Sequence, residues 1–168
     1  MRNNYNWTFL LLVVAQLLLC NYFHFTPYVF LTLLPALILC LPTRIGTTGA
    51  LFIAFGLGLT IDFFAEGLLG LNALALVPVA FVRKPLIELI FGKEPFEHQE
   101  NLSVQKYGSL RISLALIIAL ALFLVIYILA DGAGTRPFWF SAIKLVASLF
   151  ASWLLSLVAV HLLSDDER

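Results

Sequence analysis

Long apolar runs without charged residues are the feature that most constrains this chain, and residues 112–130 are the clearest of them. Only 12% of the 168 residues are charged, against about 25% in a soluble domain, and 61% are hydrophobic. About 20 apolar residues cross the ~30 Å hydrocarbon core of a bilayer as a helix. The chain is therefore predicted to be an integral membrane protein with one domain covering residues 1–168.

Six apolar runs predict an all-α bundle of six transmembrane helices, at 7–25, 28–41, 45–65, 68–82, 112–130 and 138–163. The second run is short and contains Pro35, so neighbouring helices must cover the backbone that this proline frees. The first run also fits a cleavable signal, but no small-residue cleavage site follows it, so a retained span is favoured. Cys20 and Cys40 are expected at different depths, too far apart for a disulfide, and are interpreted as apolar fillers.

Lysine and arginine in short loops predict which side of the membrane each loop faces. With the N-terminus in the cytoplasm, the outside holds only Arg136 and Lys144. The inside then holds the rest: Arg2, Arg44, Arg83, Lys84, Lys93, Lys106, Arg111 and Arg168. This asymmetry predicts that both termini and the long loop 83–111 are cytoplasmic. Residues 85–91 of that loop are expected to continue the fourth helix, with a kink, along the inner leaflet.

The stretch GLTIDFFAEGLLGLNAL, residues 58–74, places two carboxylates at helical spacing and then breaks the apolar pattern. Asp62 and Glu66 share one helical face. Gly67 and Gly70 permit a sharp reversal, and Asn72 is a good N-cap for the helix that follows. We therefore predict an external hairpin, and we take as candidate site residues Asp62, Glu66, Gly67, Gly70 and Asn72.

Two interpretations of Asp62 stay open. In the first, Asp62 only caps the hairpin and faces water. In the second, it receives a polar group of another subunit or of a ligand, since carboxylates in membrane segments are functional suspects. Arg136 and Lys144 are the external candidate cations, although Lys144 is also expected to extend outward as a simple anchor. The glycines at 46, 49, 56 and 58 predict close helix packing, either within the bundle or at an assembly face.

The hairpin resembles that of the MreD family of rod shape-determining membrane proteins. The matching positions are Gly58, Leu59, Asp62, Gly67, Leu69, Gly70, Ala73 and Leu74, with similar flanking residues at Pro42, Arg44, Arg83 and Lys84. The resemblance implies a location in the bacterial inner (cytoplasmic) membrane and a non-catalytic role in cell elongation and the regulation of peptidoglycan synthesis. It implies binding to the bitopic protein MreC, and association with MreB, RodA and a class-B penicillin-binding protein. The implied fold is similar to the substrate-binding subunits of energy-coupling-factor transporters.

The sequence also has features of two other classes of protein, a transporter subunit and an intramembrane enzyme. A small-molecule-binding subunit of such a transporter could use Asn21, Asp62, Glu66 and Asn72 as an external mouth. However, the A-x-x-x-A docking mark on the first helix is missing, because Leu19 stands four residues after Ala15. An intramembrane enzyme is disfavoured: no H-E-x-x-H occurs, and the acyltransferase-like spacing of His161 and Asp166 has no companion motif. No cofactor, metal or nucleic-acid partner is expected.

Overall fold

A computed structural model of the protein describes residues 2–22, 29–66, 69–92, 95, 107–132 and 138–165. All regular structure in these residues is helical. The elements are α1 (Arg2–Tyr22), α2 (Leu34–Leu39), α3 (Thr47–Ile61), the π-helical turn η1 (Asp62–Glu66), α4 (Leu71–Phe91), α7 (Ser109–Gly132) and α8 (Phe138–Asp165). The number of α-helices in the described part of the chain agrees with the predicted six.

Three segments are long and apolar enough to cross a membrane: Thr47–Phe64, Ser109–Gly132 and Trp139–Leu163. The apolar part of α1, Trp7–Tyr22, is shorter. Large apolar side chains such as Phe52, Leu129 and Val146 lie exposed on the outside of these helices. A surface of this kind is stable in lipid, so the helices indicate a transmembrane bundle.

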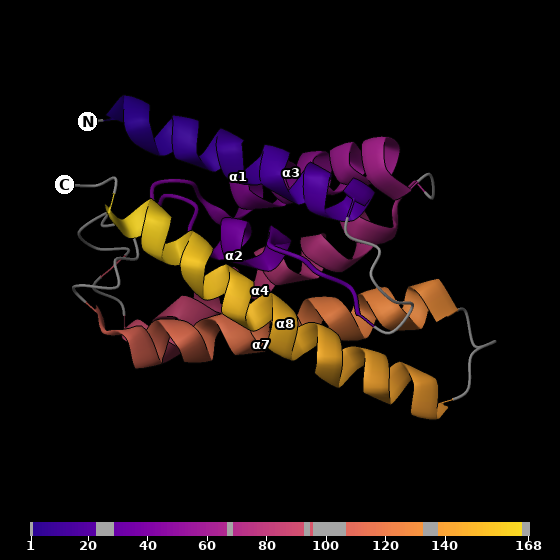
Figure 1. Ribbon diagram of the computed structural model, residues 1–168. Helices are drawn as coiled ribbons and strands as arrows, with labels where there is room; N and C mark the ends of the chain where they lie inside the picture. The colour runs from indigo at the N-terminus through magenta and orange to yellow at the C-terminus, as the bar shows by residue number, and fades with distance from the viewer. Residues whose placement is uncertain are drawn as a thin grey trace.

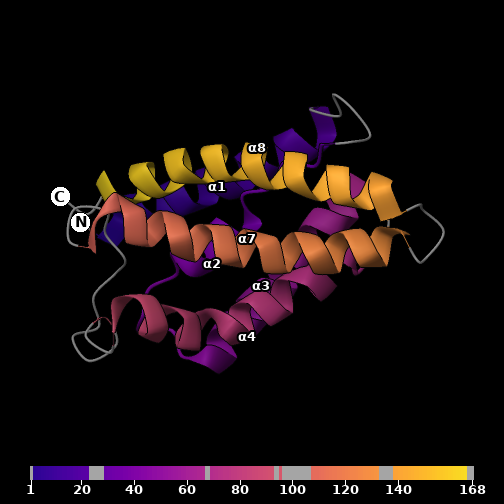
Figure 2. The same ribbon diagram turned by 90° about the horizontal axis from the view of Figure 1, so that it is seen from below.

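The long helices pack as successive neighbours, α3 against α4, α4 against α7 and α7 against α8 (Figures 1 and 2). The start of α1 and the end of α8 lie at the same end of the bundle, which we call the terminal end (Figure 1). The turn from η1 to α4 lies at the opposite end, which we call the hairpin end. Cys20 and Cys40 are both buried, and neither forms a disulfide within the described residues.

The predicted second span is not a continuous helix. Residues 29–33 are irregular and only α2, one short helix, follows them, although every residue of α2 is buried. Side chains of α1 and α8 satisfy the irregular backbone instead of helical bonds. Phe30 N donates to Ser148 Oγ (2.8 Å), Thr32 N to Ser152 Oγ (3.0 Å) and Leu33 N to Gln16 Oε1 (2.6 Å). Irregular backbone is tolerated at membrane depth only when protein covers and satisfies it, as here.

The fourth helix differs in part from its prediction. Its membrane-spanning part was expected over residues 68–82, and residues 85–91 were expected to continue it with a kink. The helix does continue, and α4 is one helix from Leu71 to Phe91 that includes Pro78 and Pro85. The expected break was placed at Arg83 because a charged residue usually marks the edge of a span. Arg83 is instead buried against α2, where its guanidinium donates to the carbonyl oxygens of Leu39 and Leu41.

Candidate functional site: the α3–α4 hairpin

A close approach of two helices defines one wall of the hairpin. A Cβ atom placed on Gly58 of α3 would lie 2.4 Å from the Cα atom of Ala73 of α4. Only glycine fits at this distance, because real Cβ contacts are longer. The other glycines of this stretch do not share the role: Gly46 and Gly56 have open space where a Cβ would lie. The predicted close packing is therefore concentrated at one residue and lies within the bundle.

The carboxyl group of Asp62 holds the two arms of the hairpin together. It is fully buried, at 0% exposure. Its Oδ2 accepts from the backbone N–H groups of Gly70 (2.9 Å) and Ala73 (3.3 Å), and its Oδ1 accepts from the backbone N–H of Asn72 (2.9 Å). These are N–H groups at the start of α4, which have no acceptor within the helix. A negative group is also favoured there by the helix dipole. Asp62 thus caps α4 from the preceding helix.

Gly70 and Asn72 complete the turn in a different way from the one predicted. Gly70 is the N-cap residue of α4 and has φ of +102°, a conformation that a side chain would strain. Asn72, which was expected to be the N-cap, lies inside the first turn. Its Nδ2 donates to Asp62 Oδ1 (2.9 Å), while its buried Oδ1 has no hydrogen-bond partner in the described residues.

This geometry bears on the first of the two interpretations of Asp62, and the second stays a hypothesis. The side chain does cap the hairpin, but it does not face water. Neither does it contact Lys144, which donates to Asp131 Oδ2 at 3.0 Å. The Gly67 backbone, the Glu66 side chain and Arg136 lie outside the described residues.

The interpretation of Lys144 as an outward anchor is wrong. It is 8% exposed, so it is not an outward anchor at the membrane surface. Its ammonium group pairs with Asp131 at the end of α7 and lies 5.9 Å from the centre of the Tyr127 ring. Lys144 therefore ties α8 to α7 near the hairpin end. Asp131 is a functional residue that was not predicted, although opposite charges on both sides of a short connection are a signal that the sequence contains.

Apolar side chains surround the turn on its outer side. Phe63, Phe64, Leu69 and Leu74 are all exposed, and Leu69 is 68% exposed and Leu74 56%. Asn21 at the end of α1 donates to the backbone carbonyl of Phe64 (3.4 Å), which joins the first helix to the turn. The described residues of the hairpin thus have a polar, buried interior and an apolar exterior.

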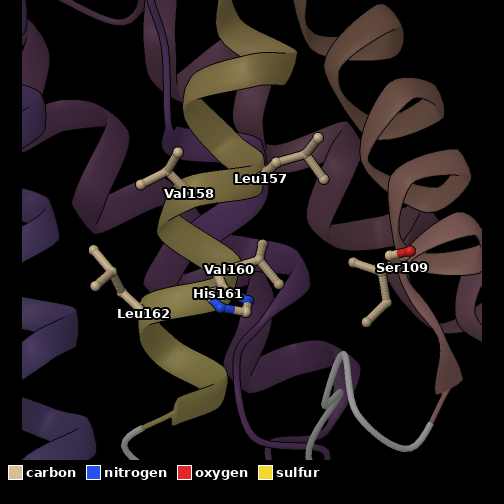
Figure 3. A pocket seen from close by; sticks show the side chains of 7 residues that line it. Ser109, Leu157, Val158, Val160, His161 and Leu162 are labelled. Carbon is tan, nitrogen blue, oxygen red and sulfur yellow. The ribbon is translucent and has the colours of Figure 1, made fainter.

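A separate cavity of about 390 Å³ lies at the terminal end, between the start of α7 and the end of α8 (Figure 3). Its walls are apolar apart from Ser109 and His161. His161 is the residue with the acyltransferase-like spacing, and its partner in that spacing, Asp166, lies outside the described residues. The cavity is remote along α8 from the Lys144 pair and does not include any candidate site residue.

No protein-family model, curated protein or solved structure matches this chain.

Proposed function

We propose that this chain is a non-catalytic membrane subunit of the bacterial cell-elongation machinery, similar to MreD, which binds an MreC-like bitopic protein and supports the regulation of peptidoglycan synthesis. The observation that carries the proposal is that the hairpin positions on which the resemblance rests fall into two groups. Some of these positions build the turn, and others project from it.

The building positions are Gly58, Asp62 and Ala73, which are buried, and Gly70, which is partly buried. Gly58 and Ala73 allow the close approach of α3 and α4, and Gly70 provides the positive φ of the turn. Asp62 uses both carboxyl oxygens on N–H groups of its own hairpin. A site at which Asp62 itself binds a partner would have to break these bonds, so recognition through this carboxyl group is disfavoured.

The projecting positions, Leu69 and Leu74, contribute little to the packing of the bundle because more than half of each side chain is exposed. Helices associate in lipid by the fit of apolar and small side chains rather than by hydrophobic burial from water. A turn that displays two exposed leucines is suited to contact the transmembrane or external segment of a bitopic partner. We therefore assign partner contact to these leucines and a scaffolding role to Asp62.

The test is recovery of an MreC-like partner from crosslinked membranes. Leu69→Asn should strongly reduce recovery without loss of thermal stability in detergent. Leu89→Asn is the matched control, because Leu89 is also an exposed leucine but lies near the end of α4, away from the hairpin, and its substitution should have no effect. If Leu69→Asn and Leu89→Asn recover the partner equally well, the assignment of the hairpin is wrong.

A second variant tests the scaffold. Gly70→Leu places a side chain at φ of +102° and should disturb both the turn and the recovery of the partner. A Gly70→Leu protein that is stably inserted and still recovers its partner fully would contradict the proposal.

Mass spectrometry of the recovered material distinguishes the two candidate functions. An MreC-like or penicillin-binding protein supports the proposal, and an ATPase module contradicts it in favour of a transporter subunit.

A further inference from the structure

Three serines of α8 form a row along one buried face of the helix, which we call the serine row. Ser148, Ser152 and Ser156 follow one another at intervals of four residues, and each is fully buried. Residues at this interval lie one above the other on an α-helix, about 6 Å apart along its axis. Lys144 extends the same row toward the hairpin end and is 8% exposed. The serine row faces the irregular segment 29–33.

The irregular segment binds the first two serines of the row. Phe30 N donates to Ser148 Oγ (2.8 Å). Two residues later, Thr32 N donates to Ser152 Oγ (3.0 Å), and this hydroxyl group donates in turn to the carbonyl oxygen of Phe30 (3.2 Å). Two residues of the segment therefore correspond to one turn of α8, so the spacing of its N–H groups matches the spacing of the serines.

The third serine is left without a role in this arrangement. Ser156 Oγ has no hydrogen-bond partner in the described residues. The next two N–H groups of the chain already have acceptors, because Leu33 N donates to Gln16 Oε1 and Leu34 N to Thr32 Oγ1 (3.2 Å). A buried hydroxyl group without a partner is unfavourable, and an alanine would avoid that cost. The packing of this arrangement therefore does not account for a hydroxyl group at Ser156.

We propose that α8 has two registers against segment 29–33, and that Ser156 is used in the second. A shift of α8 by one turn, about 6 Å toward the hairpin end, brings Ser152 to Phe30 and Ser156 to Thr32. The three hydrogen bonds between the segment and the serine row are each replaced by an equivalent bond. Movements of one helical turn between packed elements are an established form of switching. The inference is independent of the proposed function, because it concerns α8 and not the hairpin.

The length of α8 permits this shift. Its membrane-spanning part, Trp139–Leu163, has 25 residues and is about 37 Å long at 1.5 Å per residue. The hydrocarbon core of a bilayer is ~30 Å thick, so the apolar segment exceeds it by about one turn. The outer side of α8 exposes apolar residues such as Val146 and Phe150, which meet lipid and not another helix of the bundle. A helix shifted by one turn would therefore still span the membrane.

Two contacts with α7 hold the first register. Lys144 Nζ pairs with Asp131 Oδ2 at 3.0 Å, and Trp153 Nε1 donates to Ser113 Oγ at 2.8 Å. The shift breaks both contacts and moves the Lys144 ammonium group one turn toward the hairpin end, out of the bundle. The second register thus exchanges a part-buried ion pair for an exposed ammonium group. Loss of either contact should raise the population of the second register by about two- to tenfold.

Disulfide formation between paired cysteines tests the two registers. With the two native cysteines replaced by alanine, Thr32→Cys is combined in native membranes with a second cysteine in the serine row. A disulfide requires Cα atoms within about 7 Å of each other, so Ser152→Cys reports the first register and Ser156→Cys the second. Ser148→Cys is the matched control, because it lies one turn away in the other direction and faces Thr32 in neither register. We expect a disulfide with Ser156→Cys and none above background with Ser148→Cys.

Asp131→Asn supplies the direction of the effect. It should raise the yield of the disulfide between Thr32→Cys and Ser156→Cys by about two- to tenfold and leave the pair with Ser148→Cys unchanged. A general loosening of α8 would raise both pairs equally. If the pair with Ser156→Cys never exceeds the pair with Ser148→Cys, or if both respond equally to Asp131→Asn, the proposal is wrong.

A second measurement leaves the serine row intact and decides the question even if the paired variants fail to fold. Ile143→Cys is an exposed position near the start of α8, and Leu129→Cys is an exposed position of α7 at the same end of the bundle. In the Asp131→Asn background, the rate of maleimide labelling should rise several-fold at Ile143→Cys, because this position moves toward water. The rate at Leu129→Cys should not change. An equal response at the two positions, or no response at Ile143→Cys, would contradict the shift.

Discussion

At the scale of single residues, the spacing of α3 and α4 depends on the missing side chain at Gly58. The position of Ala73 leaves no room for a Cβ, whereas Gly56, two residues earlier on the same helix, has open space. The two glycines therefore form a natural comparison. They have the same helical propensity and differ only in what an added methyl group meets.

We expect Gly58→Ala to destabilise the protein by about 1–3 kcal/mol, because the methyl group must displace the backbone of α4. Gly56→Ala should be neutral or more stable by up to about 1 kcal/mol, since alanine is the better helix former. Reversible unfolding of both variants in mixed micelles measures the difference. Equal stabilities would show that α3 and α4 are not in close contact at Gly58.

Sequence reasoning placed the right residues in the hairpin but misjudged their roles. Asp62 was recognised as a carboxyl group beside a turn, yet its partners are mainly backbone N–H groups, which no side-chain pattern reveals. Lys144 was interpreted alone as an anchor. Its true partner, Asp131, is separated from it by the turn between α7 and α8, and the pairing depends on how those helices pack.

At the scale of elements, the least predictable part is the irregular segment 29–33. Its sequence is as apolar as a helix, so hydrophobicity alone could not show that the backbone leaves the helical conformation. The conformation of the segment depends on residues elsewhere in the chain. The side chains of Gln16, Ser148 and Ser152 accept hydrogen bonds from its backbone in place of helical bonds. In contrast, α7 and α8 were predicted well because long apolar runs with very few charges need no distant partner to become helices in lipid.

Two serines on α8 test this account. Ser152→Ala removes the acceptor of the Thr32 N–H and should destabilise the protein by about 1–3 kcal/mol. Ser156 lies one turn further on and is equally buried, but its Oγ has no hydrogen-bond partner in the described residues. Ser156→Ala should therefore be neutral or slightly stabilising. The comparison uses thermal unfolding in detergent, and an equal loss in both variants would contradict the role of Ser152.

At the scale of the whole molecule, the predicted orientation separates the hairpin end from the terminal end by the thickness of the membrane. The proposed partner contact then faces the outside. Charge asymmetry in the loops is the basis of this orientation, since neither the fold nor the packing distinguishes one side of a bilayer from the other.

Cysteine labelling in intact cells checks the orientation. In a background with Cys20→Ala and Cys40→Ala, a membrane-impermeant maleimide should label Leu69→Cys directly. It should label Ser109→Cys, an exposed position at the terminal end, only after the membrane is permeabilised. The opposite pattern would invert the orientation and place the hairpin in the cytoplasm.

The serines that hold segment 29–33 also bear on how the protein is made. The Ser148 hydroxyl that accepts from Phe30 is 118 residues later in the chain. At a synthesis rate of about 5–20 residues per second, roughly 6 to 24 seconds pass between the appearance of these two partners on the ribosome. The early segment therefore cannot settle in its final place when it leaves the insertion machinery. The nascent chain must keep it shielded until α8 has been synthesised and completes the centre of the protein.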